Sequence, residues 1–176
     1  MLFRSMPEVV SVPLNGPIGP WWLLGVFNWE GAAQSRMIDL EALGLPRAGY
    51  WIADLWERDV RRLAPGQLLG FDRIAAHGGH LLAIRPVIAA PQWVASDLHF
   101  SQGCEVVAWE PQAHGLTLRL SLGRRAAGAV TLSLPRTTVH VVINDQAVSP
   151  QVLGPDLVRI PIVCEQEAEI RIDWSS

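Results

Sequence analysis

Residues 21–30 read WWLLGVFNWE, and residues 49–56 read GYWIADLW. The first stretch is an apolar run that ends abruptly at Asn28, and it is too short for a membrane span, which needs about 20 apolar residues. A run of about five to eight apolar residues closed by Asn and Gly is typical of a strand covered on both faces. The second stretch has the same character and is interrupted only by Asp54. We therefore expect the two stretches to form neighbouring strands in the core of a β-sandwich.

The composition is that of a folded globular protein rather than a disordered one. The chain has 176 residues, of which 49% are hydrophobic and 18% are charged, and this length allows one or two domains. The net charge of −3 gives no electrostatic basis for binding nucleic acid or an anionic membrane, so neither is an expected partner. The absence of a recognisable secretory signal favours a cytoplasmic location.

The hydrophobic pattern changes at residues 89–91, where Ala-Ala-Pro marks a candidate domain boundary. Continuous apolar runs precede this point, and strict alternation of apolar and polar residues follows it. Alternation is typical of an antiparallel sheet with one face in water. The apolar members are Leu116, Leu118, Leu120, Leu122, Val130, Leu132, Leu134, Val139, Val141, Ile143, Ile170, Ile172 and Trp174. We predict an all-β fold of two antiparallel, Greek-key-like β-sandwich halves packed together, with domains at residues 1–90 and 91–176.

Local signals predict three further features. Residues 1–20 are rich in Pro and Gly and are expected to form an extended lead-in with one short edge strand. Residues 57–63 are charged and short, which favours a single helical turn. Asn144 and Asp145 are expected to form a turn, because both residue types tolerate the left-handed backbone conformation.

The first half of the chain resembles a known family. The segments FNWEG (27–31), IDLEALGLP (38–46), GYWIADLW (49–56) and IAAHGGHLLAIRP (74–86) resemble the C-terminal β-domain of bacterial α-galactosidase-like glycoside hydrolases of the melibiase clan. The opening LFRSMPEVVSVPL (2–14) is similar to the segment that leads out of the catalytic barrel in those enzymes. The resemblance covers mainly residues 1–88, and PQWVASDLHFSQGCEVVAWE (91–110) is only loosely similar to a segment of some large glycosidases.

The resemblance implies an accessory role. In the family the catalytic carboxylates lie in a (β/α)8 barrel that this chain lacks, so we expect no catalytic residues and no hydrolase activity in the chain itself. The expected partner is a catalytic (β/α)8 barrel domain, in the same chain or in another one, which the β-domain would stabilise or assemble with. No cofactor is expected.

Asp54 is the one acidic residue that interrupts an apolar strand. It could be a catalytic or sugar-binding carboxylate, and a small hydrolase would need a second carboxylate across the sugar. The alternative, which we favour, is a structural residue: a capping or edge residue that accepts hydrogen bonds from loop amides, or one that faces solvent.

Histidine and cysteine give no recognisable site. His77 and His80 flank two Gly and could bind zinc with a third ligand such as His99 or Cys104, but no accompanying motif is present and we predict no metal. Spacing alone cannot support a thiol dyad at Cys104, because such pairs meet in space and not in sequence. We expect Cys104 and Cys164 to be buried thiols, and a disulfide between them is the alternative, which the sequence alone does not decide.

Tryptophan is the remaining functional signal. Exposed Trp side chains bind sugars by stacking, and Trp22, Trp56, Trp93 and Trp109 lie at expected strand ends or beside turns. These four are the candidate carbohydrate-binding residues of an alternative function, that of a carbohydrate-binding module. Trp is also highly buried on average, and Trp21, Trp29 and Trp51 are assigned to the core.

Overall fold

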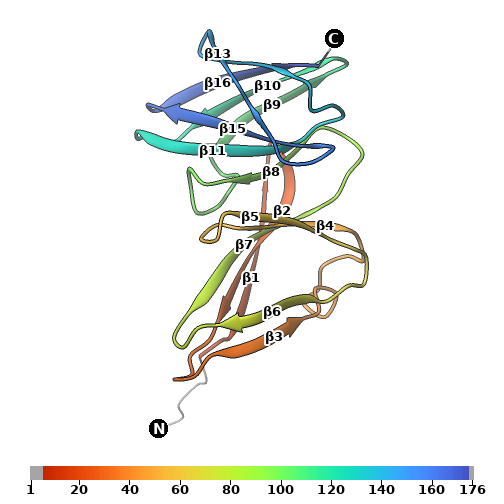
Figure 1. The fold of residues 1–176 in the computed structure, drawn as a ribbon, viewed down its shortest axis with the longest axis vertical. Helices are drawn as coiled ribbons and strands as arrows, with labels where there is room; N and C mark the ends of the chain where they lie inside the picture. Colours follow the sequence, from red (N-terminus) through yellow and green to blue (C-terminus); the bar gives the residue numbers. More distant parts are fainter. Residues whose placement is uncertain (1–5, 175–176) are drawn as a thin grey trace. The chain divides into compact units, whose positions relative to one another are not determined.

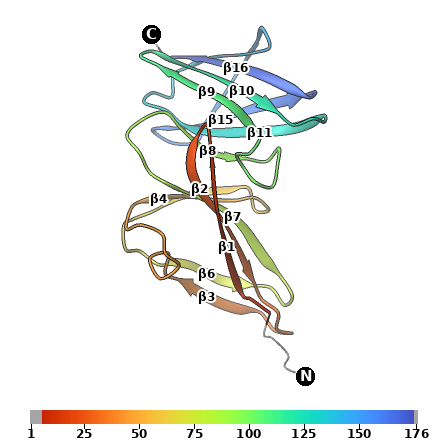
Figure 2. The same ribbon diagram turned by 180° about the vertical axis from the view of Figure 1, so that it is seen from behind.

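The fold is all-β. A computed structural model describes residues 6–174, which form sixteen strands and contain no helix (Figures 1 and 2). Every strand pair whose register is determined runs antiparallel. The predicted all-β, antiparallel fold class is therefore confirmed. No described segment forms a helix that is long and apolar enough to cross a membrane.

The chain divides into two compact units. Unit 1 comprises Met1–Leu14 and Trp21–Val87, and unit 2 comprises Asn15–Pro20 and Ile88–Ser176, within the described residues. The division thus lies three residues before the predicted boundary between residues 90 and 91. The tip of the first hairpin also groups with unit 2 rather than forming part of a lead-in, because Ile18 packs against the hydrophobic core of that unit.

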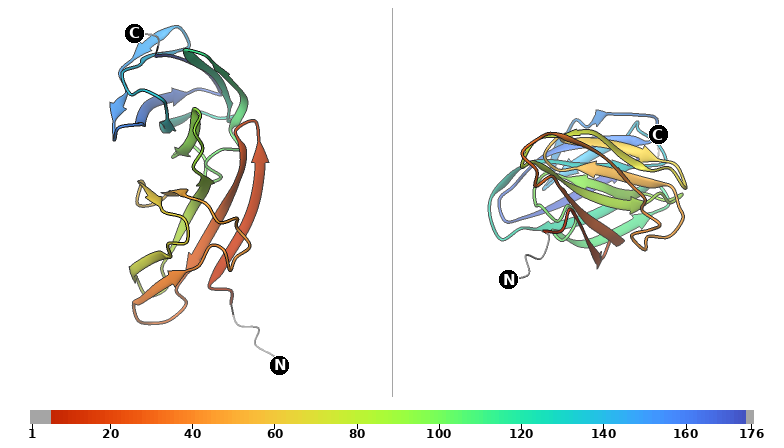
Figure 3. Two further views of the ribbon diagram at one scale, coloured as in Figure 1. Left: turned by 90° about the vertical axis from the view of Figure 1, so that its right-hand side faces the viewer. Right: turned by 90° about the horizontal axis from the view of Figure 1, so that it is seen from below.

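Unit 1 contains two sheets. The larger one has the strand order β1-β2-β7-β4-β5, and β3 pairs with β6 in the smaller one. The strands are β1 (Val9–Gly16), β2 (Gly19–Phe27), β3 (Gln34–Ile38), β4 (Tyr50–Asp54), β5 (Asp59–Leu63), β6 (Leu69–Ile74) and β7 (Gly79–Pro86). The segment expected to be a lead-in is therefore mostly strand: β1 and β2 form a hairpin, which is seen from two further directions in Figure 3. Apolar side chains of both sheets form one core, among them Leu24, Ile52, Phe71 and Leu82.

The two tryptophan-rich strands do not pair with each other, contrary to the prediction. β7 lies between them, with Leu24 of β2 opposite Leu82, and Ile52 of β4 opposite Ile84. Residues 23–26 are buried on both faces of the sheet, as the apolar run predicts. Burial on both faces predicts that a strand lies in the interior of a sheet. It does not predict which strand pairs with it, because strands pair through backbone hydrogen bonds, which do not depend on side-chain type.

The charged segment 57–63 is a turn followed by an edge strand, not a helical turn. Arg58 adopts a positive φ of 55° in the turn between β4 and β5. Arg62 on β5 lies with its guanidinium carbon 4.2 Å from the Trp51 ring centroid, and Arg61 lies 5.9 Å from the Phe71 ring centroid. Because both guanidinium groups lie over aromatic rings, these charged side chains are accommodated on a strand. Charged residues are also common on sheet edges, where they discourage pairing with other chains.

Unit 2 is a β-sandwich with its own core. One sheet has the order β13-β12-β16-β10-β9 and the other β14-β15-β11-β8. The strands are β8 (Gln92–Ser96), β9 (Val106–Gln112), β10 (Gly115–Ser121), β11 (Ala126–Ser133), β12 (His140–Ile143), β13 (Gln146–Val148), β14 (Gln151–Val152), β15 (Leu157–Cys164) and β16 (Glu167–Asp173). Leu118, Leu132 and Ile170 are fully buried members of the core between the two sheets.

The predicted alternation holds in β10 and β16 and fails in β11. In β16 the side chains alternate strictly between exposed and buried, and the apolar residues of β10 are buried as expected. In β11, however, Thr131 and Ser133 are also buried, although they were expected on a wet face. Thr131 lies between Ala95 of β8 and Arg159 of β15, and a short hydroxyl side chain in an interior strand is easily covered by such neighbours.

Candidate functional site

The turn after β2 is built on Asn28, which is 1% exposed. Its Nδ2 donates to the carbonyl oxygens of Ala32 at 2.8 Å, Ile74 at 3.1 Å and Ala75 at 2.9 Å. Its Oδ1 accepts a hydrogen bond from the Glu30 amide at 3.0 Å. The side-chain amide of Asn28 thus links the turn after β2 to the turn before β7.

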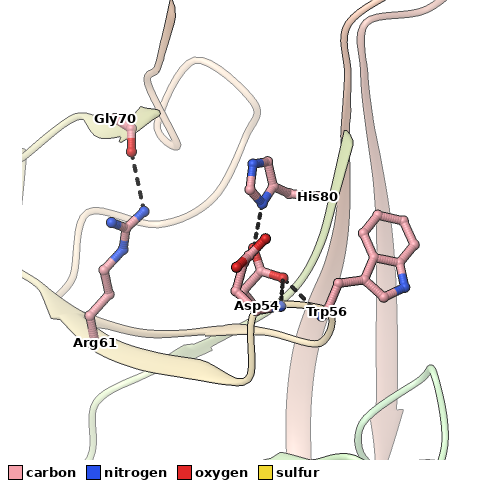
Figure 4. Close-up of polar contacts among 6 residues, drawn as sticks. Asp54, Trp56, Arg61, Gly70 and His80 are labelled. Carbon is pink, nitrogen blue, oxygen red and sulfur yellow. Dashed lines mark hydrogen bonds and ion pairs between the residues drawn. The ribbon is translucent and has the colours of Figure 1, made fainter. Parts of the chain in front are cut away.

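Asp54 plays the corresponding role at the end of β4. Its Oδ1 accepts hydrogen bonds from the backbone amides of Trp56 at 3.0 Å and Glu57 at 3.2 Å. Its Oδ2 lies 2.6 Å from Nδ1 of His80 on β7 (Figure 4). The capping interpretation is therefore correct for one carboxylate oxygen, while the other oxygen forms a pair with histidine that the sequence did not indicate.

The Asp54–His80 pair lines a cleft of about 350 Å³ in unit 1. Four consecutive strands, β4, β5, β6 and β7, supply its walls. His80 also packs against Phe71 with ring centroids 4.6 Å apart, so the imidazole is held on two sides. The lining residues are Ile52, Asp54, Glu57, Asp59, Arg61, Gly70, Phe71, Asp72, Arg73, His80 and Leu82.

The cleft is rich in hydrogen-bond acceptors. Its lining carries the four carboxylates of Asp54, Glu57, Asp59 and Asp72 and the two guanidinium groups of Arg61 and Arg73. Arg61 donates to the Gly70 carbonyl oxygen at 3.2 Å, which fixes one wall (Figure 4). Such a mixture of donors and acceptors is suited to a hydroxyl-bearing ligand, because each hydroxyl both donates and accepts a hydrogen bond.

The four candidate sugar-binding tryptophans lie in different environments. Trp56, beside the cleft, is 57% exposed, and its indole points away from the His80 ring (Figure 4). Trp22 is half-buried and packs edge-to-face against Tyr50 with ring centroids 6.5 Å apart. Trp109 is half-buried against the core of unit 2.

Trp93 and Trp29 are both placed differently from the prediction. Trp93 is 1% exposed, and its Nε1 donates to the Gln102 carbonyl oxygen at 2.7 Å, so a sugar cannot reach it as a platform. Trp29, assigned to the core from the sequence, is 40% exposed. Trp21 and Trp51 are buried as expected, with 1% and 4% of their surface exposed.

The histidines and cysteines do not converge. His77 occupies the turn before β7 with a φ of 52°, whereas His80 contacts Asp54 and His99 lies 2.7 Å from the Ser101 hydroxyl in unit 2. Within residues 6–174, no three His, Cys, Asp or Glu side chains form a group that could hold a metal ion.

The two thiols differ in exposure. Cys104 is exposed, contrary to the prediction of a buried thiol, and Cys164 is buried. Burial raises the pKa of the Cys164 thiol, and the carboxylates of Glu165 and Glu167 raise it further. Both cysteines are free.

Sequence reasoning missed most of the cleft. Phe71, Arg61 and Asp72 carry no motif, and they meet Asp54 only because β5 and β6 fold back beside β4 and β7. One signal was available, the interruption of an apolar strand by Asp54, and it identified a residue that lines the cleft.

Comparisons with solved structures give weak likenesses, two of which are described here. No protein-family model matches the chain, and no curated protein matches it. The isomalto-dextranase of Arthrobacter globiformis T6 complexed with panose matches with a TM-score of 0.33 and 15% identity, over 94% of this chain and 36% of the enzyme. BpGH86A, a β-porphyranase of glycoside hydrolase family 86 from Bacteroides plebeius, matches with a TM-score of 0.28 and 9% identity, over 98% of this chain and 35% of the enzyme. The chain spans about a third of the length of either enzyme, and a likeness at these TM-scores carries no inference about its function.

Proposed function

We propose that the chain is a non-catalytic accessory β-domain of an α-galactosidase-like glycoside hydrolase, acting beside a catalytic (β/α)8 barrel in the same or another polypeptide. The sequence resemblance of residues 1–88 is the origin of the proposal. The structure supports the proposal because the polar side chains in the segments that carry the resemblance hold turns of the fold together. Asn28 and Asp54 both bind backbone groups of their own turns, so these side chains stabilise the sandwich.

The observation that carries the proposal is the hydrogen bonding of the Asp54 carboxylate. One carboxylate oxygen accepts two backbone amides and the other pairs with His80, so both oxygens are engaged within unit 1. A glycosidase carboxylate has to be available to protonate a leaving group, activate water or attack the sugar. This arrangement supports the interpretation of Asp54 as a structural cap, and with it the proposed non-catalytic role.

The test compares the chain alone with the chain beside a barrel. The purified chain is assayed with nitrophenyl α- and β-glycosides, and we expect no turnover above buffer. It is then added to an α-galactosidase-like barrel that lacks its own C-terminal β-domain, and we expect slower thermal inactivation of the barrel than with an equal concentration of serum albumin. Turnover by the chain itself that is lost in Asp54→Asn would contradict the proposal.

A second candidate function is carbohydrate binding, favoured by the exposure of Trp56 beside the acceptor-rich cleft. Binding to an oligosaccharide array, repeated with Trp56→Ala and Trp22→Ala, tests it. No binding of the unmodified chain to any glycan on the array would remove this candidate.

A further inference from the structure

Trp29 has a side-chain arrangement that the core assignment did not anticipate. The residue follows Asn28, whose side chain makes four hydrogen bonds to the surrounding backbone, and the Asn28 amide donates to the Gly78 carbonyl oxygen at 2.9 Å. The backbone on both sides of Trp29 is therefore fixed. An aromatic side chain on a fixed backbone loses little further freedom when it binds a ligand, because only two side-chain torsions remain.

Phe27 forms the base on which Trp29 rests. Its ring lies close against the backbone of β2 and β7 at two glycines. A Cβ atom at Gly25 would lie 2.8 Å from the Phe27 ring, and a Cβ atom at Gly79 would lie 3.0 Å from it. The absence of side chains at Gly25 and Gly79 is what allows the ring to approach the sheet this closely.

The Trp29 indole stacks on Phe27 and is also held at its edge. The two ring centroids are 5.2 Å apart with an interplanar angle of 22°. Nε1 of Trp29 donates to the Pro7 carbonyl oxygen at 2.9 Å, so the only polar atom of the indole already has a partner. Because one face covers Phe27 and 40% of the residue remains exposed, the accessible part is mainly the carbon surface of a rigid ring.

Polar groups lie next to this ring. Glu8 accepts a hydrogen bond from the Phe27 amide through its backbone carbonyl oxygen at 2.7 Å, which places residue 8 beside the aromatic pair. The Glu8 carboxylate pairs with Arg36 at 2.6 Å, and Glu30 follows Trp29 directly and is exposed. The carboxylate of Glu8, held by Arg36, and the exposed carboxylate of Glu30 thus belong to residues that adjoin the aromatic pair.

We propose that the exposed face of Trp29 is a binding platform for a neutral hexopyranose unit of a saccharide. The C–H face of the sugar ring would stack on the indole, and its hydroxyl groups would bond to the carboxylates of Glu8 and Glu30. The neighbouring carboxylates disfavour a phosphate-bearing ligand such as a nucleotide.

This inference rests on the carbohydrate-binding candidate and not on the accessory role. The experiment titrates the full chain with maltotriose, isomaltotriose, cellotriose and α-1,6-galactobiose, followed by the tryptophan indole N–H signals in NMR spectra and by calorimetry. We expect at least one sugar to bind and Trp29→Ala to weaken that binding by about tenfold or more, as expected when a stacked aromatic provides the main contact. Phe100→Ala, which removes another exposed aromatic ring, is the matched control and is expected to bind as the unmodified chain does, and Trp56→Ala is titrated beside it.

A second variant, Trp29→Phe, distinguishes loss of binding from loss of folding. It keeps an aromatic ring over Phe27 and loses the hydrogen bond to Pro7, so it should fold and retain part of the affinity. Thermal unfolding of each variant confirms that the fold is intact. Binding that survives Trp29→Ala but is lost in Trp56→Ala overturns this inference while the carbohydrate-binding candidate stands, and no binding of any of the four sugars to the unmodified chain overturns both.

Discussion

Asn28 shows how one side chain can organise the turns of a β-sandwich. It is buried, and its side chain donates to three carbonyl oxygens and accepts from one amide in the turns around it, while the Ala75 carbonyl oxygen also accepts from the Gly78 amide at 3.0 Å. Buried backbone groups without partners cost about 1–3 kcal/mol each. The presence of Asn directly after an apolar run marked this turn in the sequence, but not the partners at Ile74 and Ala75, which lie far along the chain.

Replacing Asn28 with Ala should therefore be costly. The substitution removes all four hydrogen bonds, and we expect the free energy of unfolding to fall by about 2–4 kcal/mol. Urea unfolding followed by tryptophan fluorescence measures the change. Asn15→Ala is the matched control, because Asn15 is exposed, and it should change stability by no more than about 0.5 kcal/mol. Equal effects of the two substitutions would contradict this account.

Glu8 should make stability depend on pH in the acid range. The hydrogen bond and the positive charge of Arg36 lower the pKa of the Glu8 carboxyl below its ordinary value of 4.5. Since the folded-state pKa is lowered, the ion pair stabilises the fold above the unfolded-state pKa, and this contribution is lost as pH falls through the folded-state value. We expect the stability difference between the unmodified chain and Glu8→Gln to shrink from about pH 6 to about pH 3 in urea unfolding. A difference that stays constant would show that the ion pair does not contribute.

At the scale of the element, the positions of strands in the sequence were easier to predict than the strands with which they pair. The apolar run before Asn28 and the alternating residues around Leu118 correctly predicted strands, because burial on one or both faces leaves a direct pattern in the sequence. The position of β7 between β2 and β4 left no such pattern. The charged strand β5 was missed because Arg61 and Arg62 are accommodated by the rings of Phe71 and Trp51, and those contacts join residues from separate strands.

The turn between β12 and β13 was predicted, and its geometry allows it to be improved. Asn144 and Asp145 have φ values of 47° and 65°, as in a two-residue hairpin turn with left-handed conformations at both positions. Glycine is favoured at the second position of such turns. We expect Asp145→Gly to raise the free energy of unfolding by up to about 1 kcal/mol, because its exposed ion pair with Arg171 contributes little.

Thermal unfolding measures this gain, and Asp145→Ala is the control. Alanine removes the same ion pair but does not favour a positive φ, so it should lower stability. If both variants lose stability equally, the ion pair rather than the backbone conformation determines the stability of the turn.

At the scale of the whole molecule, the sequence predicted the fold class but little of the candidate site. The cleft brings together residues from four strands, and Asp54 was identified only because it interrupts an apolar run. The exposure of individual tryptophans was unpredictable, since Trp93 and Trp56 both lie near strand ends and are 1% and 57% exposed. Whether a large side chain at a strand end is covered depends on loops whose path the local sequence does not determine.

Because each unit has its own hydrophobic core, we expect a destabilising substitution in one core to affect mainly that unit. Leu24 and Leu118 are both fully buried, the first in the core of unit 1 and the second in that of unit 2. Replacing either with Ala should cost about 2–5 kcal/mol. Because the cores consist of different residues, native-state hydrogen exchange should show reduced protection in residues 21–87 for Leu24→Ala and in residues 88–174 for Leu118→Ala. A uniform loss of protection throughout the chain in either variant would show that the two cores unfold as a single cooperative unit.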